Sequence, residues 1–180
     1  MAPLRQAVEV TIVRIPIESR WASERWQPAR VEIASDRTGR SARDIVPGEC
    51  LCERTDAAGD HWRCSGFEIE LHATEAEGYY LNLSAPDPCV FVMWRSFDDG
   101  AMPPVRPVVV TVSYNEAARF MDAGEQVDTV PMIPAIADWL RPFVAANYKP
   151  EPRRKVRRND PVGDSKVAGP GEPGEGFPRR

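Results

Sequence analysis

Apolar residues recur at every second position in two stretches of this chain, and that period constrains its fold more than any other feature. Valine, isoleucine, leucine or phenylalanine alternates with polar side chains over residues 8–12 and again over residues 67–71. Successive side chains of a strand point to opposite faces, so the pattern predicts two strands, each with one buried and one solvated face. The stretches "RVEIA" at 30–34 and "EQVDTV" at 125–130 predict two shorter strands.

Two other stretches are apolar on both faces, "CVFVMW" at 89–94 and "VVVTV" at 108–112. Strands buried on both sides have this composition, so both are expected at the centre of the fold, with Cys89 as a core residue. Between the strands, residues 35–60 carry glycine and proline punctuation and predict a long loop.

Three helices follow from local start and stop signals. Residues 74–77, "TEAE", and 113–116, "SYNE", each read as a capping box, in which Ser or Thr accepts from the third helical amide while Glu reaches back. The first helix is expected to run to about residue 83, and the second to end at Ala123-Gly124, with glycine in the left-handed position. Pro134 suits the first turn of a third helix, whose apolar period continues to about Asn147.

These elements predict a single α+β domain over residues 1–148, with a mixed or antiparallel sheet and about three helices. After Tyr148 the composition changes to proline, glycine and charge, which cannot bury enough apolar surface to offset ordering entropy. Residues 149–180 are therefore expected to be a disordered tail.

The tail is basic and the body is acidic. Of the 23 basic and 27 acidic residues, nine and five lie in residues 149–180, which gives the tail a formal charge of +4 and leaves −8 to residues 1–148. The tail cluster could bind nucleic-acid phosphates, an acidic protein surface or anionic lipids, or could remain solvated. An acidic body disfavours nucleic acid as the partner. The cluster consists of Arg153, Arg154, Lys155, Arg157 and Arg158.

Targeting signals are not recognisable in the sequence. The first residues alternate in the manner of a strand and lack the apolar core of a signal peptide, and no run approaches the ~18 apolar residues of a membrane span. We therefore expect a cytoplasmic protein with no membrane span, in which cysteines are ordinarily reduced.

Four soft ligands fall within fifteen residues, which raises the possibility of zinc. Cys50, Cys52, His61 and Cys64 could wrap a tetrahedral ion, although a C-x-C pair is a less common spacing than C-x-x-C. The alternatives are a reversible Cys50–Cys64 or Cys52–Cys64 disulfide, or cysteines packed as small hydrophobes. We expect neither zinc nor any other cofactor, and keep a zinc-binding or redox-sensing protein as an alternative.

Catalytic motifs are lacking. His61 and His72 are the only histidines, His72 lies on the polar side of its strand, and there is no G-x-S-x-G nucleophile elbow. The sequence therefore predicts a protein that is not an enzyme, with no catalytic residues.

Aromatic residues supply the candidate binding surface. Trp21 and Trp26 lie in a charged segment without apolar period, where a tryptophan either covers the edge of the core or anchors a protein partner. We expect at least one to be an anchor. Tyr79, Tyr80 and Asn82 form a second candidate surface, although helical spacing indicates that at least one tyrosine packs internally.

Three stretches of the chain resemble a known family. They are the Arg20–Trp26 segment, "ELHATEAEGYYLNLSAPDPCVFVMWR" at 70–95, and "RPVVVTVSYNEAARFMDAGEQVDTVPMIPAIADWLRPFVAANYKPEPRRKVRRNDP" at 106–161. Together they resemble an uncharacterised proteobacterial domain-of-unknown-function family that is often encoded beside formate dehydrogenase and molybdenum-cofactor genes. The resemblance implies a small accessory protein without an established activity.

The sequence and the resemblance together predict a non-catalytic, cytoplasmic accessory protein that acts by protein–protein contact. The resemblance implies that its client is a molybdenum formate dehydrogenase or that enzyme's maturation machinery. A nucleic-acid-binding factor that uses the tail, and the zinc or redox sensor, remain the alternatives.

Overall fold

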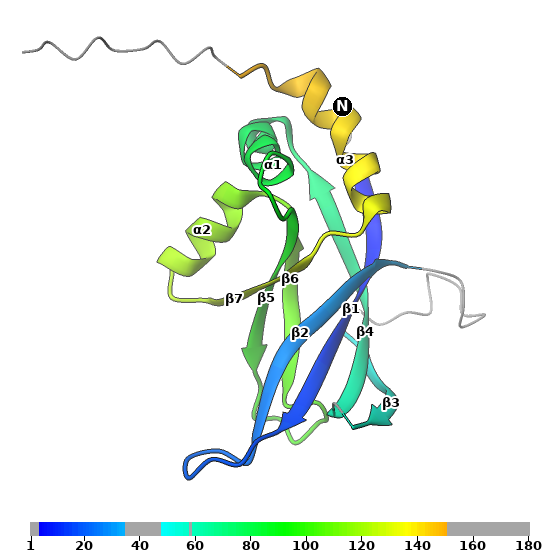
Figure 1. Ribbon diagram of the computed structural model, residues 1–180, viewed down its shortest axis with the longest axis vertical. Helices are drawn as coiled ribbons and strands as arrows, with labels where there is room; N and C mark the ends of the chain where they lie inside the picture. The colour runs from blue at the N-terminus through cyan, green and yellow to red at the C-terminus, as the bar shows by residue number, and fades with distance from the viewer. Residues whose placement is uncertain (1–3, 35–47, 58, 151–180) are drawn as a thin grey trace, which may run out of the picture. The chain divides into compact units, whose positions relative to one another are not determined.

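Two antiparallel sheets and three helices make up the structure, a computed structural model that describes residues 4–34, 48–57 and 59–150 (Figure 1). This confirms the predicted α+β class. The strands are β1 (Leu4–Pro16), β2 (Glu24–Ile33), β3 (Cys50–Asp56), β4 (Gly59–Leu71), β5 (Cys89–Ser96), β6 (Val105–Thr111) and β7 (Gln126–Pro131). The helices are α1 (Ala76–Leu83), α2 (Tyr114–Asp122) and α3 (Pro134–Asn147), with a short 3-10 helix (Ala73–Glu75) before α1.

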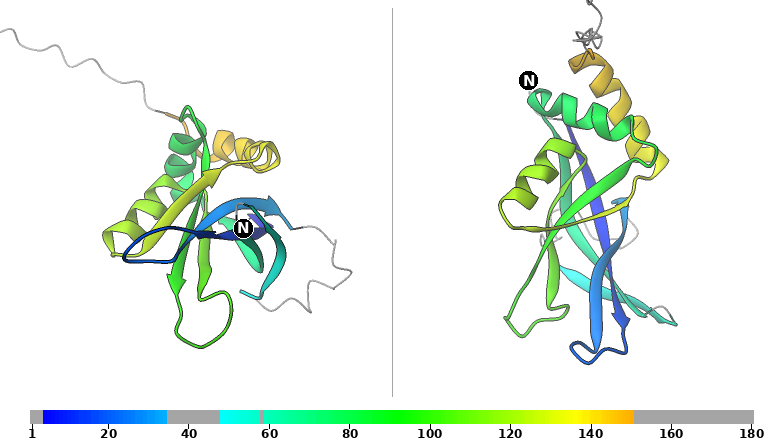
Figure 2. Two further views of the ribbon diagram at one scale, coloured as in Figure 1. Left: turned by 60° about the horizontal axis from the view of Figure 1, so that its bottom comes forward. Right: turned by 60° about the vertical axis from the view of Figure 1, so that its left-hand side comes forward.

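The first four strands form one sheet in the order β2-β1-β4-β3, and the last three form a second in the order β6-β5-β7. Every neighbouring pair is antiparallel. The two sheets also approach one another, since β2 lies beside β7 and β4 lies beside β6. The core therefore lies between the sheets, and α1 and α3 lie at one end of the strands (Figures 1 and 2).

The alternating pattern of β1 identifies the core correctly but not the opposite face. Val8, Val10 and Ile12 are buried as predicted, but Glu9 and Thr11 are also buried, at 9% and 5% exposure. The central position of β1 explains the difference, because side chains from β4 cover its second face. Ser65 donates a hydrogen bond to Glu9 at 3.2 Å.

The segment predicted as a loop over residues 35–60 contains a strand and the beginning of another. β3 pairs with β4 from Cys50 opposite Cys64 to Asp56 opposite Gly59. Its residues after Cys50 are all exposed, because β3 is an edge strand, so the sequence shows no apolar alternation. Residues 35–47 of the predicted loop lie outside the described residues.

The two predicted capping boxes have different outcomes. Ser113 accepts a hydrogen bond from the Glu116 amide at 3.1 Å and caps α2, whereas the Glu116 carboxylate binds Thr111 instead of reaching back. Thr74 does not cap α1, because the 3-10 turn that contains it leads directly into the helix. As predicted, Gly124 ends α2 with a φ of 81°.

The third helix is confirmed in its bounds and its buried face. Pro134 occupies its first turn, the helix ends at Asn147, and Ile136, Leu140 and Val144 are buried. Among the described residues, none of the helices has the length and apolar character needed to cross a membrane.

Candidate protein-binding surface

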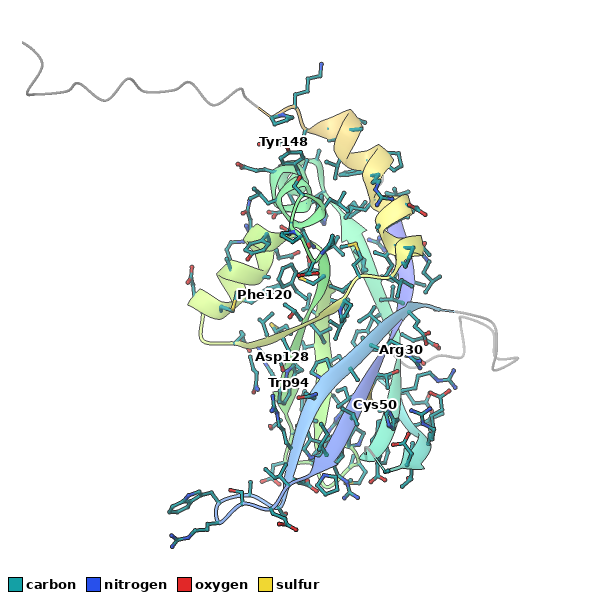
Figure 3. The ribbon with its side chains drawn as sticks, in the orientation of Figure 1. Arg30, Cys50, Trp94, Phe120, Asp128 and Tyr148 are labelled. Atoms are coloured by element: carbon teal, nitrogen blue, oxygen red, sulfur yellow. A yellow bond between two sulfur atoms is a disulfide. The ribbon has the colours of Figure 1, made fainter. Side chains whose placement is uncertain are left out.

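A tryptophan at the tip of the β1–β2 hairpin is the most exposed large apolar side chain among the described residues. Trp21 is 90% exposed. The turn that carries it spans residues 17–23 and is closed at its base by the Ile17 amide, which donates to the Ser23 carbonyl at 3.0 Å. Within the turn, the Trp21 amide donates to the Ser19 hydroxyl at 3.2 Å. The indole is therefore presented by an ordered turn, and the hairpin that carries it projects away from both sheets (Figure 3).

Trp26, the second tryptophan of the hairpin, covers the edge of the core, which is the other role predicted for these two residues. Trp26 lies in β2, is partly buried, and packs against the core. Its indole N–H donates to Glu24 at 2.8 Å, and the same carboxylate forms an ion pair with Arg14 at 3.4 Å. Arg14 also pairs with Asp60 of β4 at 2.5 Å. This network ties the base of the hairpin to the sheet, so the position of Trp26 is explained by its contacts within the fold.

The β5–β6 loop carries a second exposed aromatic residue. Phe97 is 38% exposed and Met102, in the same loop, is 53% exposed. The loop is closed by the Phe97 amide, which donates to the Pro104 carbonyl at 2.7 Å. The Arg106 guanidinium lies 4.4 Å from the centre of the Phe97 ring and also pairs with Asp99, which holds the ring in place.

Both hairpins project from the end of the strands opposite α1 (Figures 1 and 2). We refer to residues 17–23 and 97–104 together as the two-loop end. It carries nearly half of the exposed large apolar side chains that the structure describes: Ile17, Trp21, Phe97 and Met102. Sequence reasoning missed the β5–β6 loop, and "FDDGAMPP" at 97–104 offered only a turn signal.

The second predicted surface lies largely inside the protein. Asn82 and Tyr79 are fully buried, which corrects the expectation that they face a partner. Asn82 donates to the carbonyls of Cys89 and Val112 at 2.7 and 2.9 Å and accepts from the Cys89 amide at 3.0 Å, so it joins α1 to β5 and to the residue that follows β6. Tyr80 is half-buried, and its ring centre lies 5.0 Å from that of Tyr148. Cys89, expected in the core, is also half-buried.

The cysteine-rich segment forms a cross-strand disulfide. Cys50 of β3 and Cys64 of β4 face each other and are bonded. Cys52 remains a free, exposed thiol. His61 lies near Arg54 and Asp56, at 3.4 and 3.3 Å, on the face of the sheet opposite the buried Cys64.

The four predicted zinc ligands therefore do not converge on one point. Within residues 4–34, 48–57 and 59–150, no three side chains of His, Cys, Asp or Glu are grouped as a metal site.

A polar cluster between α1 and α2 is the strongest candidate for acid–base chemistry. Glu75 accepts from the buried Ser113 hydroxyl at 2.6 Å and from Arg119 at 2.7 Å. Burial alone would raise the pKa of Glu75, but these hydrogen bonds more than offset it and hold the pKa below its usual range. Ser113 also caps α2, so its hydroxyl is already engaged as both donor and acceptor. The cluster has the contacts of a packing element between two helices.

His72 and Tyr79 are two further titratable side chains close to this cluster. His72 is exposed, and its ring lies 3.4 Å from Glu70, as expected for a surface residue. Burial raises the pKa of Tyr79 to about 12, and its hydroxyl accepts from the His72 amide at 3.1 Å. A neutral, internally bonded phenol of this kind supports the fold rather than proton transfer.

A polar groove of about 440 Å³ crosses the outer face of the four-stranded sheet. Its basic side chains already have acidic partners, since Arg30 pairs with Glu32 at 3.2 Å and Arg54 with Asp56 at 2.9 Å. The groove therefore lacks the convergent unpaired groups that orient a small ligand. Its lining consists of Thr11, Ala29, Arg30, Glu53, Arg54 and His61. The predicted tail cluster at 153–158 lies outside the described residues.

Comparison with known proteins places the chain in a family without giving it an activity. A family profile described as a protein of unknown function, DUF3305, matches residues 7–157. The chain therefore belongs to this family, which agrees with the predicted membership of an uncharacterised family. No match was found among the curated proteins or the solved structures.

Proposed function

We propose that this chain is a non-catalytic accessory protein that acts by binding another protein through its two-loop end. The observation that carries the proposal is the 90% exposure of Trp21 on an ordered hairpin tip. Tryptophan is one of the residue types enriched among the few side chains that dominate binding energy at protein interfaces. Phe97 and Met102 add residue types that are also enriched at interface cores.

The contrast between the two tryptophans supports this reading. Trp26 contributes its ring to the core and its N–H to Glu24, so its position is explained by folding. Trp21 belongs neither to the core nor to the side chains packed against it and is 90% exposed, with the Arg20 guanidinium 5.8 Å from its ring centre. Folding therefore gives no reason for an indole at position 21, whereas binding a partner does.

For the client, we propose a molybdenum formate dehydrogenase or one of the proteins that mature it, in the cytoplasm. This part of the proposal rests on the family resemblance of the segments at 20–26, 70–95 and 106–161.

The test compares binding with stability in the same variants. Proteins retained from the native cell by the wild-type chain would be purified, and their affinity measured for Trp21→Ala and for Leu81→Ala. Leu81 is a matched control, since it is 45% exposed and lies on α1, at the opposite end of the strands. Losing a buried anchor costs ~2 kcal/mol or more, so Trp21→Ala should weaken binding by roughly 30-fold.

Stability decides how a loss of binding is interpreted. Trp21→Ala should stay within about 0.5 kcal/mol of wild type, as exposed substitutions do, whereas Leu71→Ala, a core control, should lose ~2–5 kcal/mol. Wild-type affinity of Trp21→Ala for every retained protein would contradict the proposal. An affinity loss shared equally by Leu81→Ala would contradict the assignment to the two-loop end.

Redox sensing is a second candidate function, favoured by the Cys50–Cys64 disulfide. Cytoplasmic disulfides are usually transient or redox-sensing, so a disulfide in a cytoplasmic chain would point to regulation. Reduction by a dithiol transfers two electrons and two protons and leaves two thiols, while the reductant becomes a disulfide. Thiolates, and not disulfide sulfurs, bind zinc, so the zinc alternative requires the reduced form.

Thiol labelling in denaturant tests this candidate. Without reductant only Cys52 and Cys89 should react, and after reduction all four cysteines should react. A sensor should titrate between the two states in glutathione buffers of cytosolic poise; a disulfide intact throughout that range would exclude the role. Elemental analysis of the reduced protein should show no zinc, since His61 and Cys64 lie on opposite faces of β4.

A further inference from the structure

The unpaired arginines of the structure are concentrated in the β1–β2 hairpin. Every arginine within the described residues forms an ion pair with a carboxylate except Arg20 and Arg25. Both are exposed, and they flank Trp21 in the turn and in the first residues of β2. In a body with a formal charge of −8 over residues 1–148, acidic partners are abundant, so two unpaired guanidinium groups on the hairpin that carries Trp21 distinguish this hairpin.

The Arg20 guanidinium and the Arg25 backbone both have defined positions. The Arg20 guanidinium lies 5.8 Å from the centre of the Trp21 ring, a cation–π contact that orients its N–H groups. Arg25 pairs with Ile15 across the β1–β2 ladder, so its backbone is fixed by the sheet. Guanidinium groups bind carboxylates through two parallel hydrogen bonds, and a pre-oriented group loses less entropy on binding.

We propose that the hairpin docks on an acidic segment of the partner, with apolar side chains against Trp21 and carboxylates bonded to Arg20 and Arg25. This deepens the proposed function and rests on it, because it names the chemistry of the partner surface. Charge complementarity carries the assignment, since these are the basic groups of the hairpin that the fold itself leaves unpaired.

A short acidic segment fits the surroundings better than an extended polyanion. Glu18 is exposed in the same turn, and Asp98 is exposed in the neighbouring β5–β6 loop. A phosphate backbone or an anionic membrane would place further negative charge against these carboxylates and against the acidic body. A segment that contacts only the two arginines and the indole avoids that repulsion.

The experiment uses the full chain and two labelled synthetic peptides. One has a central pair of leucines flanked on each side by two glutamates, and the other has lysines in place of the glutamates. Fluorescence anisotropy at about 0.05 M salt would compare wild type with Arg20→Glu/Arg25→Glu. The control, Arg54→Glu/Arg141→Glu, makes the same change in net charge at two exposed, ion-paired positions.

We expect the glutamate peptide to bind the wild type and the control with equal affinity. Its affinity for the hairpin variant should be lower by roughly tenfold or more. Binding should weaken as salt rises, because exposed charges are screened beyond ~10 Å at 0.1 M. Equal binding of the lysine peptide, no binding of either peptide, or equal loss in the control would overturn the proposal. So would tighter binding to phosphatidylglycerol vesicles or to oligothymidylate than to the glutamate peptide.

Trp21→Ala separates this proposal from the proposed function. If Trp21→Ala weakens binding of the purified client but Arg20→Glu/Arg25→Glu does not, the two-loop end is a binding surface and its acidic partner is refuted. If neither variant changes binding of the client, both proposals fail.

Discussion

Asn82→Ala should destabilise the protein strongly although it removes no apolar side chain. The side chain is fully buried and makes three hydrogen bonds, all to backbone groups of Cys89 and Val112. Alanine would leave one amide and two carbonyls buried without these partners. Each such group costs ~1–3 kcal/mol, and because the three share one side chain we expect about 3–5 kcal/mol in total.

Urea unfolding followed by circular dichroism would measure the loss. For a domain of this size a loss of 1 kcal/mol lowers Tm by about 2–4 °C, so Asn82→Ala should melt roughly 10 °C below wild type. Asn147→Ala is the matched control, since Asn147 also donates to a backbone carbonyl, that of Phe143 at 2.8 Å, but is exposed. It should change stability by less than about 1 kcal/mol.

The isosteric Asn82→Asp provides a second readout. Aspartate keeps the shape but removes both N–H donors and places a carboxylate against two carbonyl oxygens. We expect it to be at least as destabilising as alanine at pH 7 and less so at pH 4, where the protonated carboxyl is neutral and can donate once. If Asn82→Ala unfolds within 1 kcal/mol of wild type, the reasoning that Asn82 joins α1 to the three-stranded sheet is refuted.

Two further predictions concern backbone geometry and pH. Gly59→Ala should destabilise the protein more than Gly48→Ala, as measured by urea unfolding. Both glycines have positive φ, but a Cβ at Gly59 would lie 1.8 Å from the Arg14 carbonyl oxygen, whereas a Cβ at Gly48 would meet open space. Equal losses of unfolding free energy in the two variants would contradict this. Burial raises the pKa of Tyr79 to about 12, above the ~10 of the unfolded chain, so its contribution to stability is complete below pH 10 and is lost as pH rises toward 12. Tyr79→Phe should therefore show a shallower loss of unfolding free energy between pH 10 and 12 than wild type, and identical slopes would refute the assignment.

Local patterns in the sequence predicted the elements whose causes are local. Alternation placed Val8, Val10 and Ile12 in the core, and Ser113 and Gly124 marked the two ends of α2. These features depend on residues within a few positions of one another, so a single sequence contains the information. The class of the fold followed from the same patterns.

Strand pairing and solvent exposure required the tertiary structure. β3 is an exposed edge strand held in place by β4, and nothing in its own residues alternates. Trp21 and Trp26 occupy similar charged surroundings in the sequence, yet one lies on the turn and the other against the core, because the hairpin register fixes where β2 begins. Burial of Asn82 likewise depends on the tertiary structure, which brings the carbonyl of Val112, 30 residues away, to the side chain that also binds Cys89.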